Sequence, residues 1–262
     1  NGLAVLFTAY MFLYAAFFLM FPGSLRGWLM LGPWLLCLRG VMVTFSRGGY
    51  LAVAAGSLAV AWFRSKRLFL LTMALLAVVV LSPNFLPAGI RHRLETTWQG
   101  AGPSASGEVA EQRLESSAAN RLQAWRAALT MIREHRWWGV GFGAFPLYVG
   151  HYTTGNMSDF DAHNAFLLIG AEMGLITLGV FLVVLGLAGY YAWGLYRHAG
   201  DPVTQALALG VLGGLAGIVA ANTFISGFDA QETVGSFWIL CALIMRLVQL
   251  ERSTTPEQRV AQ

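Results

Sequence analysis

The sequence predicts an all-α integral membrane protein, and three features of its composition point to this class. Hydrophobic residues fill 56% of the 262 positions and charged residues only 11%, whereas soluble proteins carry about 25% charged residues. The mean hydropathy is +0.59. The chain also holds 17 Phe and 9 Trp. Together these values exclude an ordinary soluble enzyme.

The positive charge of the chain indicates membrane orientation rather than nucleic-acid binding. The net charge of +4 comes from 16 Arg and a single Lys against 13 acidic residues, and no basic run exceeds residues 64–67. In so apolar a chain, scattered basic residues mark the cytoplasmic ends of membrane helices. Cys37 and Cys241 lie far apart in apolar runs, so they indicate neither a disulfide framework nor a zinc site.

Seven apolar stretches are candidate membrane helices, since about 20 residues cross the hydrocarbon core. They cover residues 2–21, 28–45, 48–63, 68–86, 165–195, 203–225 and 234–250. The third is short, and the fifth is long enough to tilt or to project beyond the bilayer. Because the chain starts without Met and directly in an apolar stretch, we expect it to be a fragment of a longer protein.

The basic residues of the short connections predict the orientation of these helices. They gather on one side, which is therefore cytoplasmic: Arg26, Arg64, Lys66, Arg67, Arg197, Arg246, Arg252 and Arg259. We thus expect four membrane helices in 1–86, one large extracytoplasmic loop in 87–164, three helices in 165–250 and a cytoplasmic tail in 251–262. Arg47 falls on the same outer side as the large loop.

The large loop holds two kinds of sequence. Residues 99–119 are rich in Gly, Ser and Ala and predict a flexible crossing. Residues 120–136 predict an amphipathic helix, capped by Asn120, whose apolar residues recur at spacings of three and four: Leu122, Trp125, Leu129 and Ile132. Arg121 flanks this stripe, as is typical of a helix at a membrane surface. The glycine-rich run 139–143 follows a helix rather than a strand, so it predicts tight turns and not a dinucleotide site.

Three groups of residues occur in a recognisable order. The first is Ser46-Arg47-Gly48-Gly49, and the second runs from Arg121 through Trp125 to the glycine run and Phe145. The third is Ala162-His163-Asn164, followed after nine residues by Gly174 and after two more by Thr177. In this combination, over residues 28–195, the chain resembles the O-antigen ligase-like superfamily of bacterial envelope glycosyltransferases.

The resemblance implies a multi-spanning, GT-C-like transferase at the periplasmic face of the bacterial inner membrane. Such an enzyme moves a glycan from undecaprenyl pyrophosphate to an acceptor hydroxyl, which in ligases belongs to the lipid A–core. Relatives polymerise repeat units or glycosylate proteins, so a growing glycan or a protein is an alternative acceptor. The implied partners are the lipid-linked donor, the acceptor and membrane lipids, with no nucleic acid. The resemblance also implies no cofactor and no metal.

The residues suit this chemistry. An imidazole with a pKa near 6.5 is suited to general-base work, so His163 is the candidate catalytic residue. Arg47 and Arg121 are candidates for binding the pyrophosphate, because a guanidinium forms bidentate contacts with phosphate oxygens. For these residues the structural alternatives are a hydrogen-bonded interfacial His and Arg side chains that snorkel to lipid headgroups.

Four further residues are candidate supporting groups. Asp161 either orients His163, as carboxylates do in catalytic dyads, or joins Asp159 in binding Mg²⁺. Asn164 shares the motif of His163. Glu172, in the fifth helix, is a functional candidate as an intramembrane acid. We expect it to form an ion pair with Arg39 at similar depth.

Two other functions are consistent with parts of the sequence. A transporter of lipid-linked or anionic substrates would also use outer Arg residues. Transporters often show internal repeats, and this sequence shows none. Transport would also not need His163. An intramembrane serine protease would use Ser226, but the sequence offers no buried His partner at a suitable depth. The small-residue run that contains Gly213 and Gly214 predicts close helix packing and no chemistry.

Overall fold

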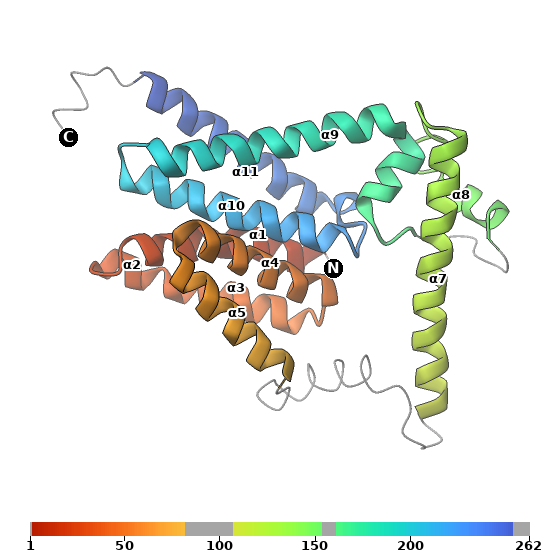
Figure 1. Ribbon diagram of the computed structural model, residues 1–262, viewed down its shortest axis with the longest axis horizontal. Coiled ribbons are helices and arrows are strands. Elements are labelled where there is room, and N and C mark those ends of the chain that lie inside the picture. The colour runs from red at the N-terminus through yellow and green to blue at the C-terminus, as the bar shows by residue number, and fades with distance from the viewer. Residues whose placement is uncertain (1, 82–106, 154–160, 254–262) are drawn as a thin grey trace. The chain divides into compact units, whose positions relative to one another are not determined.

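The computed structural model describes residues 2–81, 107–153 and 161–253, and every regular element in these ranges is helical. The elements are α1 (Gly2–Met20), α2 (Leu25–Leu29), α3 (Leu31–Val43), α4 (Arg47–Arg64), α5 (Lys66–Leu81), α7 (Gly107–Glu134), α8 (Phe145–Tyr148), η2 (Val149–His151), α9 (Ala165–His198), α10 (Pro202–Asn222), η3 (Gly227–Asp229) and α11 (Gln231–Ser253) (Figure 1). The described chain therefore confirms the predicted all-α class.

Four described helices are long and apolar enough to cross a membrane: α1, α9, α10 and α11. The helices found in the other three predicted spans are α3, α4 and α5, of 13, 18 and 16 residues. At 1.5 Å per residue, α3 is only about 20 Å long, which is short of the roughly 30 Å of hydrocarbon. The count of seven spans stays a prediction.

The described residues divide into two compact units. The first comprises Asn1–Ala74, Leu182–Asn222 and Gly227–Gln262, and the second comprises Leu75–Phe181 and Thr223–Ser226. The helix α9 belongs to both, with its N-terminal part in the second unit. The second unit contains the described part of the predicted large loop together with the residues around His163.

The first unit is built around α10, which packs against α1 and α4. The small-residue run of α10 makes this packing possible, because the helices approach so closely that its glycine positions leave no space for a Cβ atom. A Cβ atom at Gly213 would lie 2.5 Å from Val60 Cγ2, and one at Gly214 would lie 2.8 Å from the Ala9 carbonyl oxygen. The expected close helix packing is thus confirmed.

The second unit is held together by a small apolar core under α7. Four residues of α7 are fully buried, namely Ala124, Ala127, Ala128 and Met131, and they pack against Phe145, Val149 and Leu168. Because three of the four are Ala, the helix approaches its neighbours closely. The buried surface of α7 is therefore made mostly of small residues.

The face of α7 that packs in the second unit is made mostly of Ala, while Leu122 and Leu129 of the predicted apolar stripe are 53% and 42% exposed. The expected placement of this stripe at a membrane surface stays a prediction. Two other expectations about this helix were wrong. Asn120 is not an N-cap, since it lies within α7. Residues 107–119, expected to be an irregular crossing, are helical, and 99–106 lie outside the described residues.

A break at Gly174 divides α9 into two segments that point in different directions (Figure 1). Gly174 has φ 82° and ψ 171°, a conformation open to glycine alone. The glycine-rich loop docks at this break through three backbone hydrogen bonds. Val140 and Gly141 donate to the carbonyls of Ala171 and Glu172, at 2.9 Å each, and Leu175 donates to the carbonyl of Arg136 at 2.7 Å. The expected tight turns of the glycine run thus join it to α9.

The fit at this junction predicts a specific sensitivity to one methyl group. In Gly174→Ala the new Cβ would lie 2.1 Å from the Trp137 carbonyl oxygen, and the residue would keep an unfavourable positive φ. We therefore expect the free energy of unfolding to fall by about 1–3 kcal/mol. The matched control is Gly179→Ala, where a Cβ meets no atom within 4 Å. The control should be neutral or slightly stabilising. Thermal unfolding midpoints in detergent measure both, and equal midpoints would contradict the described junction.

Candidate functional site

The backbone around His163 is strained and fixed on both sides. His163 has φ 48°, in the left-handed region that few non-glycine residues occupy. On one side, the Trp125 indole N–H donates to the carbonyl of Ala162 at 2.8 Å. On the other, the side chain of Asn164 accepts the N–H groups of Phe166 and Leu167 at 3.0 and 3.1 Å, which caps the start of α9. Strain of this kind clusters at functional sites.

Asp161 lies beside His163 and holds a second partner. The Asp161 Oδ2 atom is 3.5 Å from His163 Nδ1. The other carboxylate oxygen accepts a 2.8 Å hydrogen bond from the Ser226 hydroxyl. An Asp fixed in this way favours one orientation of the imidazole and stabilises its protonated form. The arrangement agrees with the orienting role expected for Asp161, which stays a prediction.

Sequence reasoning missed two residues of this site in these roles. Ser226 was considered only as a nucleophile, and Trp125 only as part of an apolar stripe and of the family motif. Ser226 lies 65 positions from Asp161, in the segment that follows α10. No rule of sequence spacing predicts a contact between residues so far apart. Trp125 had one usable signal, since a buried indole N–H needs an acceptor. Trp125 also contacts Phe224, with ring centroids 6.4 Å apart.

Arg121 lies on the same edge of α7 as Trp125, one helical turn earlier. Its Nε atom is buried and has no hydrogen-bond partner. The charge of Arg121 is close enough to His163 to affect its titration. A guanidinium whose donors are not all used within the protein is suited to bind an anion.

Burial lowers the pKa of His163 below its ordinary value of 6.5, because it disfavours the charged imidazolium. The Asp161 carboxylate opposes this effect, and the positive charge of Arg121 adds to it. The net result favours the neutral imidazole at pH 7. Neutral imidazole is the form that accepts a proton from a hydroxyl group.

Glu172 is buried, at 6% exposure, in the first segment of α9. Its carboxylate Oε1 accepts the backbone N–H of Phe145, the first residue of α8, at 2.9 Å. Its burial is therefore accounted for within the second unit. The expected ion pair with Arg39, an exposed residue of the first unit, stays a prediction.

Arg47 belongs to the first unit, at the start of α4. The buried hydroxyl oxygen of Ser46 accepts the N–H of Gly49 at 3.3 Å and caps this helix. A Cβ at Gly49 would lie 2.8 Å from the Cβ of Ala4, so glycine allows α1 to pack here. The Ser-Arg-Gly element is thus a capped helix start that leaves the Arg47 side chain exposed.

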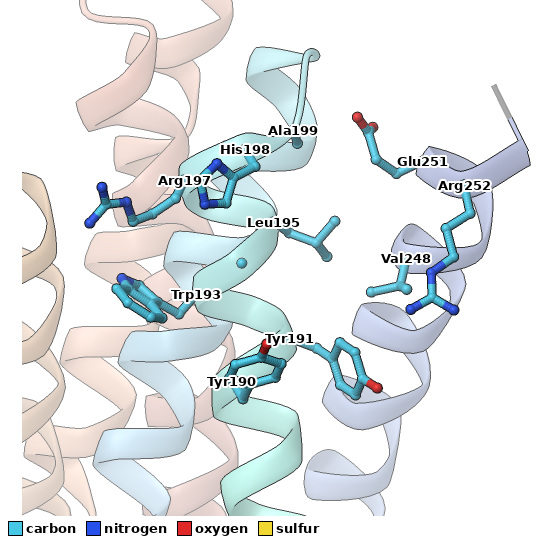
Figure 2. A pocket seen from close by; sticks show the side chains of 11 residues that line it. Tyr190, Tyr191, Trp193, Leu195, Arg197, His198, Ala199, Val248, Glu251 and Arg252 are labelled. Atoms are coloured by element: carbon cyan, nitrogen blue, oxygen red, sulfur yellow. The ribbon is translucent and has the colours of Figure 1, made fainter. Parts of the chain in front are cut away.

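A groove of about 450 Å³ lies in the first unit, between the C-terminal ends of α9 and α11 (Figure 2). Its walls include Leu195, Val248 and Arg252. None of the predicted site residues lines it. Among the described residues, no group of three His, Cys, Asp or Glu side chains is placed to hold a metal ion. Asp159, the partner proposed for Asp161 in binding Mg²⁺, lies outside those residues.

Four candidate membrane helices and an Arg-His-Asp group at the start of one of them define a multi-spanning membrane protein with a charged site. The family model described as O-Antigen ligase matches residues 32–182, more than half of the chain, and the chain belongs to this family. The match includes Arg39, Arg47, Arg121, Asp161, His163, Asn164 and Glu172, whereas Ser226 lies beyond it. The comparison with curated proteins gives no significant match.

The charges around His163 predict opposite shifts in two variants. Arg121→Gln should raise the pKa of His163, since a positive neighbour is removed, and Asp161→Asn should lower it. Diethyl pyrocarbonate reacts with neutral imidazole, so the pH profile of its reaction at the His163 peptide, followed by mass spectrometry, measures the pKa. His198, in the first unit, is the internal control. Profiles that do not move in either variant would show that these charges do not act on His163.

Proposed function

We propose that this protein transfers a glycan from undecaprenyl pyrophosphate to an acceptor hydroxyl, as an O-antigen ligase does, at the periplasmic face of the inner membrane. The observation that carries the proposal is the group formed by His163, Asp161 and Arg121 within one unit. Membership of the O-antigen ligase family supports the same function. The family alone does not choose an acceptor.

In the proposed reaction, His163 acts on the acceptor. The hydroxyl oxygen attacks the anomeric carbon of the donor sugar, and His163 takes the proton of that hydroxyl. The bond between the anomeric carbon and the pyrophosphate oxygen breaks as the new glycosidic bond forms. Asp161, 3.5 Å from His163 Nδ1, stabilises the imidazolium that results. Ser226 holds Asp161 in place through its hydroxyl.

The departing pyrophosphate gains negative charge as this bond breaks. Cations placed where charge develops in the transition state supply a large share of catalysis in many enzymes. We assign this role to Arg121, whose buried Nε has no partner in the protein, and to the exposed Arg47 at the start of α4. The Arg residues would supply the positive charge, so the proposal requires no metal and no cofactor.

Two other acceptors define the alternatives within the family. A polymerase would use the same donor and transfer it to a growing glycan, and a protein transferase would use a side-chain hydroxyl. The preference for the lipid A–core as acceptor rests on the match of His163, Asn164, Gly174 and Thr177 to the ligase motif. Transport of lipid-linked substrates is the rival of a different class, and it has no use for His163 as a base.

The test is complementation of two bacterial strains, one without its O-antigen ligase and one without its polymerase. We expect the full-length protein to restore the capping of lipid A–core with preformed polymer, seen as a lipopolysaccharide ladder on a gel. If only the strain without its polymerase recovers the chain length of its glycan, the result would instead favour polymerase activity.

His163→Ala tests the mechanism in the same strains. Removal of a general base costs roughly 10²–10⁴-fold in rate, so we expect the ladder to disappear. His151→Ala is the matched control, because His151 is an exposed histidine of the same unit. Variants that accumulate in the membrane to equal levels are compared. An undiminished ladder in His163→Ala would support transport and exclude His163 as the base.

A further inference from the structure

The loop that follows α7 presents large apolar side chains at the surface of the second unit. Trp137 is 57% exposed, Trp138 80% and Phe142 84%, and Leu147 in the following helix α8 is 71% exposed. We call these three aromatic residues, together with Leu147, the aromatic surface. In soluble proteins, large exposed apolar patches mark protein–protein or membrane interaction sites.

The aromatic surface has a fixed place along α9. The hydrogen bonds that dock the loop join it to residues 171–175, and the carbonyl of Arg136, next to Trp137, accepts the N–H of Leu175. Figure 1 shows the loop at the point where α9 turns. Trp137 and Trp138 are therefore at the level where the long segment of α9 begins.

The burial of α9 changes at the same point. Before the break, Ala165, Gly170 and Ala171 are buried in the core of the second unit. After it, Leu175 and Ile176 are 40% and 47% exposed, and apolar residues stay exposed farther along the helix. Exposed aliphatic side chains on a candidate membrane helix are suited to contact lipid.

The long segment of α9 is by itself sufficient to cross a membrane. At 1.5 Å per residue, the whole of α9 would measure about 51 Å, well beyond the roughly 30 Å of hydrocarbon. The segment Leu175–His198 alone would measure about 36 Å, enough to cross with a modest tilt. A crossing by this segment would place the start of the hydrocarbon region within the first turns after Gly174.

We propose that the aromatic surface inserts into the boundary between headgroups and acyl chains of the leaflet that α9 enters. Its partner is lipid, because hydrogen bonds hold the loop at residues 171–175, directly beside the exposed Leu175 and Ile176 of a candidate membrane helix. Trp is enriched at this depth in membrane proteins. The exposed Arg133 and Arg136 of the same region would reach the headgroup phosphates. The insertion does not depend on the proposed reaction.

Spin labels measure the insertion directly. In a background with Cys37→Ala and Cys241→Ala, a nitroxide is attached at Trp138→Cys or at Phe142→Cys, one site at a time, and the protein is placed in lipid nanodiscs. Collisions with oxygen, which concentrates in lipid, are compared with collisions with a water-soluble nickel chelate. Leu187→Cys, an exposed site far along α9, is the lipid reference. Gly200→Cys, where a Cβ meets nothing within 4 Å, is the water reference.

The proposal predicts that both labels collide with oxygen in preference to nickel, as at Leu187. A preference for nickel like that at Gly200 would overturn it, because the aromatic surface would then lie in water. Low rates with both reagents would overturn it as well, since the surface would then be covered by protein. Unchanged helical circular dichroism in each labelled variant shows that the substitutions leave the fold intact.

Discussion

The second unit depends on the backbone hydrogen bonds that the glycine-rich loop makes with α9 beside its break at Gly174. A helix that breaks in the middle leaves carbonyl and amide groups without their usual partners, and each buried group left unpaired costs about 1–3 kcal/mol. Here the N–H groups of Val140 and Gly141 and the carbonyl of Arg136 take the vacant places. The break and the glycine-rich loop therefore require each other. Glycine is needed on both sides, because a Cβ at Gly139 would lie 2.2 Å from the Glu172 carbonyl oxygen.

This junction also determines where the charged site forms. The first segment of α9 turns away from the long segment and packs with α7, whose buried face consists largely of Ala. The neighbouring edge of α7 carries Arg121 and Trp125 toward the chain that precedes α9. Trp125 fixes Ala162, and Asn164 caps the helix, so His163 is held between two anchored neighbours. These contacts maintain a positive φ that would cost about 1–3 kcal/mol in isolation.

The few charged residues of the described chain divide into groups with different surroundings. Glu172 is buried and satisfies a backbone N–H, so its contact is structural. Asp161 and His163 are half-buried, and their mutual contact leaves the imidazole accessible. Arg121 combines a buried Nε with a position near His163. Water screens the interaction between the half-buried Asp161 and His163 less than it would screen two fully exposed charges.

The sequence by itself determined the helical class, the membrane character and the family, and it named the candidate site residues, since composition and motif spacing are local properties. It did not determine which face of α7 is buried, because the large residues Leu122 and Leu129 dominate a hydrophobic pattern while the smaller Ala residues make the close contacts. It named Gly174 as part of a motif but not as the break in α9. Only the tertiary structure decided that break and the meeting of Ser226 with Asp161, since both depend on hydrogen bonds between segments far apart in the chain.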